Sequence, residues 1–306
     1  MELHRWLAGR RPHRPDVLLG MGDDCAVVRA DADGPWVLKV DPTLEGQHFE
    51  VGSRDALAIA RKAVHRPASD LAALAAQPCF ALLSLEVPRG TPPSWIRQLI
   101  RGVETACRRL GGELVGGHTA SSAPRLALHV TWVGRSVLRR PWSRRRARPG
   151  DLLLATGAFG GSRLGKHRRF QPRIREALAL AASGEPVHAA VDVSDGLALD
   201  AGRLAAASHL RLVLEAGEIP IAPAARRLAQ RTGEHPLSHA LSDGEDYELL
   251  LATPPRSLPG LLRTAKRHRF VLSRLGRFEH GSGVYLADEA GALAPVEPRG
   301  YVQRFV

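Results

Sequence analysis

The sequence predicts a mixed fold, α/β or α+β, built from two parts. Apolar runs typical of β-strands alternate along the chain with amphipathic runs at helical spacing. A chain of 306 residues can form one large domain or two medium ones. The Arg-rich segment 135–148 is followed at once by a new apolar run. We therefore expect the chain to divide into residues 1–148 and 149–306.

The elements follow from local patterns. Residues 94–110 carry apolar side chains at helical spacing and end at Gly111, which predicts a helix capped by Ser94. A helix is expected over 56–64, and after Pro67 a second helix that begins near Asp70, with a further helix directly after Gly196. Strands are expected at residues 36–40, 79–87, 126–134, 152–156, 212–215, 249–253 and 284–287.

Composition excludes several classes of protein. With 44% hydrophobic and 24% charged residues, the chain is neither disordered nor fibrous. It has no apolar run near the roughly 20 residues that span a bilayer, nor an N-terminal signal segment, so we expect a cytoplasmic protein without a membrane partner. Cys25, Cys79 and Cys107 lack the spacing of a zinc site or disulfide framework. The net charge of +12 comes with a general bias toward arginine, alanine and glycine, so it does not by itself predict a nucleic-acid partner.

Short acidic clusters recur in glycine-rich surroundings of this basic chain. Taken singly, each could be a helix cap or a turn. Carboxylates held close together repel, however, and a divalent cation is the usual compensation. At residues 192–196, a helix start would also offer backbone amides to phosphate. Together the clusters predict a magnesium and phosphate site; they lie at residues 22–24, 40–41, 69–70, 192–196 and 242–246.

The acidic clusters belong to a set of motifs that runs from about residue 20 to the C-terminus. In chain order, the motifs are 20–27 (GMGDDCAV), 41–49 (DPTLEGQHF), 69–74 (SDLAAL), 116–117 (GG), 192–197 (DVSDGL), 240–249 (ALSDGEDYEL) and 300–301 (GY). This ordered set resembles the thiamine-monophosphate kinase family. That family lies in a superfamily with aminoimidazole ribonucleotide synthetases, selenophosphate synthetases and the hydrogenase maturation dehydratase.

The resemblance implies a fold and a reaction. The fold is the two-domain aminoimidazole ribonucleotide synthetase-like one, with an N-terminal domain that binds ATP and magnesium and dimerises through its sheet, followed by a C-terminal α+β domain. The reaction transfers the γ-phosphoryl group of ATP to thiamine monophosphate, giving thiamine diphosphate, with Mg²⁺ as cofactor and the protein as a homodimer.

The resemblance also assigns roles position by position. Asp192 and Asp195 are the expected catalytic residues. The expected magnesium ligands are Asp24, Asp41, Asp70, Asp192 and Asp195. The expected nucleotide contacts are Gly116, Gly117, Arg144 and Ser194, and the expected thiamine monophosphate contacts are His48, Glu245 and Tyr301.

Four places in the chain depart from the family pattern. His118 stands where an Asp ligand is expected, and it is a poor magnesium ligand because magnesium prefers hard oxygen donors. Lys39 replaces a small hydroxyl residue and would put a fixed positive charge where a metal ion would bind. Residues 67–68 (PA) replace Asn-Leu, and residues 160–162 (GGS) replace Gly-Asp-Ser before a shortened helical stretch.

These departures leave alternatives open. The chain is an active kinase with fewer metal ions, a non-catalytic or weakly active nucleotide-binding homologue, or a superfamily enzyme that acts on another substrate.

Overall fold

The computed structural model describes residues 14–20, 23–29, 34–121, 124–297 and 299–301. Met21 and Gly22, which belong to the first acidic motif, lie outside these residues. The chain forms two compact units, Met1–Pro141 and Trp142–Val306, called here the N-terminal and C-terminal units. In the part of the chain that is described, no helix is both long and apolar enough to cross a membrane.

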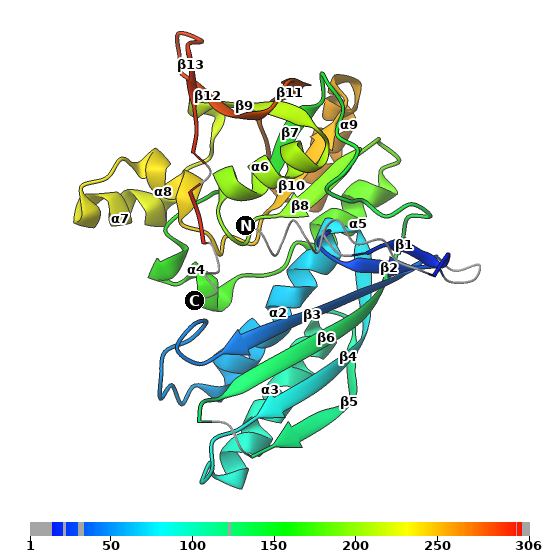
Figure 1. The fold of residues 1–306 in the computed structure, drawn as a ribbon, viewed down its shortest axis with the longest axis vertical. Coiled ribbons are helices and arrows are strands. Elements are labelled where there is room, and N and C mark those ends of the chain that lie inside the picture. The colour runs from blue at the N-terminus through cyan, green and yellow to red at the C-terminus, as the bar shows by residue number, and fades with distance from the viewer. Residues whose placement is uncertain (1–13, 21–22, 30–33, 122–123, 298, 302–306) are drawn as a thin grey trace. The chain divides into compact units, whose positions relative to one another are not determined.

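The N-terminal unit is a six-stranded sheet with helices on one face (Figure 1). Helices α2 (Ala56–Ala73) and α3 (Pro93–Arg109) contact each other, and α2 contacts the middle strands. Strands β4 and β5 pair in parallel and all other neighbours are antiparallel. In spatial order the strands are β1 (Val17–Leu19), β2 (Ala26–Val28), β3 (Trp36–Leu44), β6 (Ala127–Ser136), β4 (Ala76–Glu86) and β5 (Glu113–Ala120).

The C-terminal unit is built on a seven-stranded sheet in which only β9 and β12 pair in parallel. In spatial order the strands are β13 (Leu293–Pro295), β12 (Gly283–Ala287), β9 (Leu210–Glu215), β11 (Leu272–His280), β7 (Leu152–Thr156), β10 (Leu249–Thr253) and β8 (Ala189–Asp192). The helices are α4 (Lys166–Arg169), α5 (Ile174–Ala182), α6 (Leu197–Ala207), α7 (Pro223–Thr232), α8 (Pro236–Ser242) and α9 (Leu258–His268).

Strands β7, β10 and β8, which lie side by side at one edge of this second sheet, are buried on both faces. Every residue of β8 and β10 is buried, and so is all of β7 after its first residue. The main core lies between this sheet and α6, which contacts β8, β9 and β12. Mixed, largely antiparallel sheets with helices confirm the α+β class. Burial on both sides also holds the carboxyl end of β8, where Asp192 stands, in a fixed place.

Two predictions about helix ends are wrong. Pro67 does not separate two helices, because α2 continues through it from Ala56 to Ala73. Proline removes one helical hydrogen bond, but most of α2 is buried, and that packing outweighs the loss. Asp70 therefore lies within the last turns of α2 and not at a helix N-terminus. Ser94 does not cap α3, since the helix already begins at Pro93, whose fixed φ suits the first helical position.

Candidate functional site

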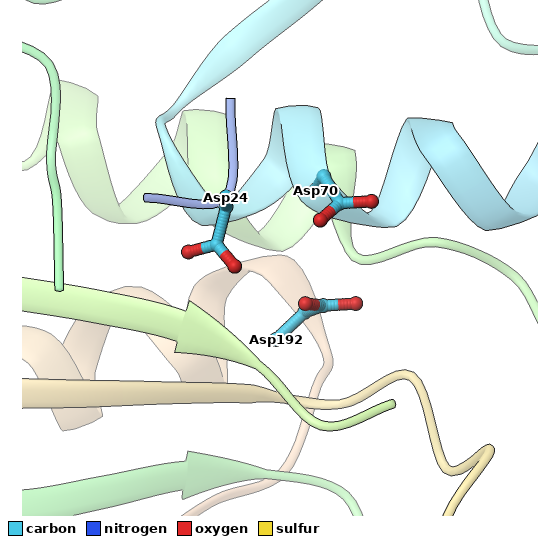
Figure 2. Close-up of side chains that lie close together, drawn as sticks. All are labelled: Asp24, Asp70 and Asp192. Carbon is cyan, nitrogen blue, oxygen red and sulfur yellow. The ribbon is translucent and has the colours of Figure 1, made fainter. Parts of the chain in front are cut away.

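Three elements of the N-terminal unit bring acidic side chains together. Asp24 stands just before β2, Asp41 lies on β3 and Asp70 on α2. Asp24 and Asp70 are buried, and each has a carboxylate oxygen within 4.8 Å of the other's. Figure 2 shows these two side chains; Asp192, also drawn there, belongs to the C-terminal unit. The structure thus gathers residues that are far apart in sequence, as expected of a cation site.

Lys39 lies among these carboxylates. Its Nζ is 2.9 Å from Oδ1 of Asp70 and 3.7 Å from Oδ1 of Asp41. It also donates a hydrogen bond of 3.2 Å to the backbone oxygen of Asp24. Burial disfavours the charged form, but Asp70 and Asp41 outweigh it and raise the pKa of Lys39 above its ordinary value. The ammonium group is therefore positively charged at every physiological pH.

His48 and Arg66 flank the same part of β3. Arg66 donates to the backbone oxygen of Pro42, and its second guanidinium nitrogen lies 3.7 Å from Oδ2 of Asp41. His48 Nδ1 accepts a hydrogen bond of 2.9 Å from the backbone N–H of Leu44. Burial, followed by the charges of Arg66 and Lys62, lowers the pKa of His48 to about 3. His48 is therefore neutral near pH 7, and its proton is on Nε2.

Gly116, Gly117 and His118 lie on β5, the edge strand of the first sheet. Gly117 has φ +154°, and a Cβ there would come within 1.9 Å of the Leu83 backbone oxygen, so only glycine fits. His118 is exposed. Two strands, β4 and β6, separate β5 from Asp41 on β3. The structure therefore does not bring His118 into the group formed by Asp24, Asp41 and Asp70.

In the C-terminal unit, three of the predicted motifs meet through backbone hydrogen bonds. The N–H of Glu245 donates to Ser194 O at 2.7 Å, and the N–H of Tyr301 donates to Asp195 O at 2.9 Å. Tyr247 N–H donates to Val193 O, also at 2.7 Å. Glu245 and Tyr247 both have positive φ, a strained conformation for side chains of this size. These hydrogen bonds hold the strained segment against the loop that follows Asp192.

The backbone amides of residues 194–196 do not await a phosphate, which corrects the expectation from sequence. Oδ2 of Asp200, in the first turn of α6, accepts hydrogen bonds from the N–H groups of Ser194, Asp195 and Gly196 at 3.0, 2.8 and 3.3 Å. Arg203 in turn contacts the carboxylates of Asp200 and Asp195 at 2.7 and 2.5 Å. In this structure the carboxylate of Asp200 therefore accepts the hydrogen bonds that the sequence predicted for a phosphate.

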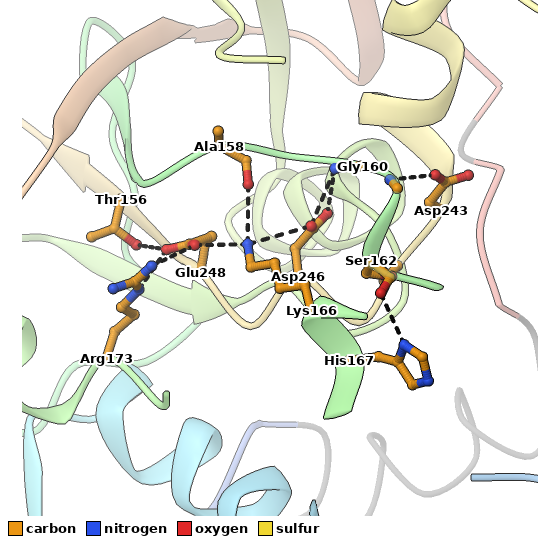
Figure 3. A network of polar contacts seen from close by, with 12 residues as sticks. Thr156, Ala158, Gly160, Ser162, Lys166, His167, Arg173, Asp243, Asp246 and Glu248 are labelled. Atoms are coloured by element: carbon orange, nitrogen blue, oxygen red, sulfur yellow. Dashed lines mark hydrogen bonds and ion pairs between the residues drawn. The ribbon is translucent and has the colours of Figure 1, made fainter. Parts of the chain in front are cut away.

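A second acidic group lies in the C-terminal unit around Glu248. The sequence predicted its neighbours at 242–246 as part of a magnesium and phosphate site, but it identified neither Glu248 nor the cationic partners of this group. Glu248 is buried, and Arg173 contacts both of its carboxylate oxygens at 2.6 Å (Figure 3). Lys166 and the Thr156 hydroxyl donate to the same carboxylate at 2.8 and 2.7 Å. Burial opposes ionisation, but Arg173 and Lys166 prevail and lower the pKa of Glu248.

Asp243 and Asp246 extend this group toward the segment 160–161. The N–H of Gly160 donates to both oxygens of Asp246 at 3.1 and 3.0 Å, and the N–H of Gly161 donates to Asp243 at 2.6 Å (Figure 3). Lys166 Nζ lies 3.5 Å from Asp246. Asp243, Asp246 and Glu248 are thus joined to protein donors, which is typical of a structural network. The acidic cluster 242–246 was the sequence signal for this group, but it did not show that protein donors pair with these acids.

The remaining predicted residues are Asp192, at the buried end of β8, and Arg144, in the segment before β7. Arg144 is half-buried, and its backbone oxygen accepts a hydrogen bond from Ser208 at 3.1 Å. This hydrogen bond fixes the backbone that carries the Arg144 side chain.

Comparison with known proteins gives one consistent result. Residues 22–136 match the family described as AIR synthase related protein, N-terminal domain, and residues 147–289 match the corresponding C-terminal domain. The thiamine-monophosphate kinase of Rhodopirellula baltica is 34% identical over 304 residues, which cover 97% of this chain and 95% of the relative.

Solved structures are similar along nearly the whole chain. The thiamine-monophosphate kinase of Stenotrophomonas maltophilia is 31% identical with a TM-score of 0.76, and 96% of each chain is covered. A structure described as AaThiL complexed with AMPPCP and TMP has a TM-score of 0.77 at 28% identity and covers 91% of this chain and 90% of that one. The chain therefore belongs to the AIR synthase related proteins and, within them, to the thiamine-monophosphate kinase family.

Proposed function

We propose that this protein transfers the γ-phosphoryl group of ATP directly to thiamine monophosphate and so makes thiamine diphosphate. The observation that carries the proposal is the gathering of Asp24, Asp41 and Asp70, each from a family motif, in one place within the N-terminal unit. The likeness to thiamine-monophosphate kinases over 97% of the chain supplies the reaction. A kinase that transfers directly needs ordered acids and cations and no protein nucleophile.

Magnesium is the proposed cofactor, and the residues fit it. Carboxylate oxygens are hard donors of the kind that Mg²⁺ prefers, and they are buried enough to hold a fixed geometry. When bound, the ion would draw phosphate oxygens together and neutralise charge that develops during transfer. Arg203 contacts the carboxylate of Asp195, so a magnesium ion bound to Asp195 would share that carboxylate with the guanidinium group. The proposed ligands are Asp24, Asp41 and Asp70 in the N-terminal unit and Asp192 and Asp195 in the C-terminal unit.

The substrate contacts are proposed from family position and local chemistry. A neutral His48 with its proton on Nε2 can donate a hydrogen bond to thiamine monophosphate without adding charge. The Tyr301 ring is half exposed beside the loop of Asp195 and can pack against an aromatic ligand. Glu245 is the third proposed contact with this substrate. The proposed nucleotide contacts are Gly116, Gly117, Arg144 and Ser194.

A homodimer is proposed on the open face of the first sheet. The large apolar side chains Val40, Phe80, Leu82 and Val115 are exposed on β3, β4 and β5, and exposed apolar side chains gathered on one sheet are typical of an interface. We assign dimerisation and ATP binding to residues 1–148, and the rest of the chain to the C-terminal domain. A cytoplasmic location is proposed because the reaction consumes ATP.

Release of ADP tests the reaction. Purified protein with ATP, Mg²⁺ and thiamine monophosphate should turn over, and omission of any one component should stop it. Asp192→Asn should lower the rate by at least about 100-fold, because a metal ligand accounts for several kcal/mol of charge stabilisation. Asp151→Asn is the matched control, since Asp151 is equally buried but pairs with His188.

The outcomes separate the alternatives. Full activity in Asp192→Asn would remove that residue from the site. Nucleotide binding without turnover would identify a non-catalytic homologue. Turnover only with another phosphate acceptor would identify a different superfamily reaction.

A further inference from the structure

Lys39 has a position that a bound cation would normally take. Its ammonium group contacts carboxylate oxygens of Asp70 and Asp41 and the backbone oxygen of Asp24, all from different elements of the N-terminal unit. Oxygen atoms that converge in this way on one positive centre are what a divalent cation attracts. In this chain the positive centre is part of β3.

The choice of lysine at this position is informative. Only four of the 43 Lys and Arg residues in the chain are lysines, at positions 39, 62, 166 and 266. Where this protein pairs a carboxylate for structural purposes it mostly uses arginine, as with the contacts of Arg173 to Glu248, Arg203 to Asp200 and Arg211 to Glu279. Arginine presents a broad planar fork, whereas the lysine ammonium is a compact point charge. Lysine is therefore the basic residue that best replaces a small ion.

The contact distances show which carboxylate oxygens the Lys39 ammonium approaches. It occupies Oδ1 of Asp70 at 2.9 Å and lies nearest to Oδ1 of Asp41. A divalent ion placed against these two oxygens would be repelled by the ammonium, and Arg66 lies 3.7 Å from Oδ2 of Asp41. The two acids therefore accommodate fewer divalent ions than they would without Lys39.

We propose that Lys39 is a resident cation that replaces one divalent ion in the N-terminal acidic group, so that this kinase operates with one magnesium ion fewer than a Lys39-free site would bind. This inference rests on the proposed function. It makes Lys39 a positioning residue, which keeps Asp41 and Asp70 in place for the ions that remain.

The number of bound ions tests the inference without any turnover. Mn²⁺ is titrated into the protein in the presence of a saturating non-hydrolysable ATP analogue, and free Mn²⁺ is measured by electron paramagnetic resonance. Lys39→Met, which keeps most of the side-chain length but removes the charge, should bind one more Mn²⁺ per chain than the wild type. Lys39→Arg should bind the same number as the wild type, because the charge is kept.

Lys166→Met is the matched control. Lys166 also pairs with two buried carboxylates, but in the structural network around Glu248. Its loss should lower stability and leave the number of bound Mn²⁺ ions unchanged. Folding of Lys39→Met is followed by circular dichroism with and without Mg²⁺, since the ion should stabilise this variant more than the wild type.

Two other results would overturn the inference, and a third would contradict the proposed function on which it rests. Equal Mn²⁺ numbers in the wild type and Lys39→Met would show that the ammonium does not stand in for an ion. A Lys39→Met protein that stays unfolded even at high Mg²⁺ would show the same, because the ion could not replace the charge. A wild type that binds no Mn²⁺ beyond what the nucleotide carries would instead contradict the magnesium site of the proposed function.

Discussion

The two units each bury a group of carboxylates, and they balance the charge in different ways. In the C-terminal unit, Glu248 receives Arg173, Lys166 and Thr156 at 2.6 to 2.8 Å. In the N-terminal unit, Asp41 lies 3.7 Å from both Lys39 and Arg66, and Asp70 lies 2.9 Å from Lys39. Burial of acids is therefore no sign of a metal site by itself. A candidate ion site differs in that its carboxylates lie close to one another and have longer contacts with the basic side chains around them.

The largest expected effect comes from breaking the tight group. Glu248→Gln removes the charge that compensates Arg173 and Lys166, and loss of one partner from a buried pair typically costs about 3–5 kcal/mol. We expect a fall of that size in the free energy of unfolding of the C-terminal unit, measured by urea denaturation. If the free energy of unfolding fell by less than about 1 kcal/mol, the ion pairs around Glu248 would not be strong structural contacts.

The sequence predicted the acids of the N-terminal group, but only part of the group around Glu248, for identifiable reasons. Asp24, Asp41 and Asp70 were found because they lie in family motifs. Lys166 and Arg173 were not found, because they come from a segment of irregular pattern, and only the fold brings them to Glu248. No sequence pattern shows which donor will satisfy a buried carboxylate.

The secondary structure was predicted best where a strand is a continuous apolar run that is buried on both faces. Strands β7 and β10 have the predicted bounds, because both are continuous apolar runs. Strand β5 was missed, since it contains Gly116, Gly117 and His118 and is exposed along most of its length. The sequence did not predict that Asp200 accepts hydrogen bonds from the 194–196 amides, because an acidic residue near a helix start can be either a cap or a ligand.

A smaller effect should appear with pH in the N-terminal unit. The pKa of His48 is lowered to about 3 by burial and by Arg66 and Lys62, whereas an unfolded chain protonates histidine near pH 6.5. Between these values the unfolded state binds more protons, so stability falls as pH decreases from about 6.5 toward 3. His48→Asn should flatten this dependence, as measured by thermal unfolding across that range. An unchanged slope would mean that another group causes it.

The contrast between the two groups is tested most directly by Mn²⁺ affinity in paired variants, measured by electron paramagnetic resonance under conditions where both proteins are folded. If the N-terminal acids hold the metal and the Glu248 group is structural, Asp24→Asn should weaken Mn²⁺ binding by at least about tenfold, while Glu248→Gln keeps the wild-type affinity despite its lower stability. Wild-type Mn²⁺ affinity in Asp24→Asn, or a loss of affinity confined to Glu248→Gln, would contradict this assignment.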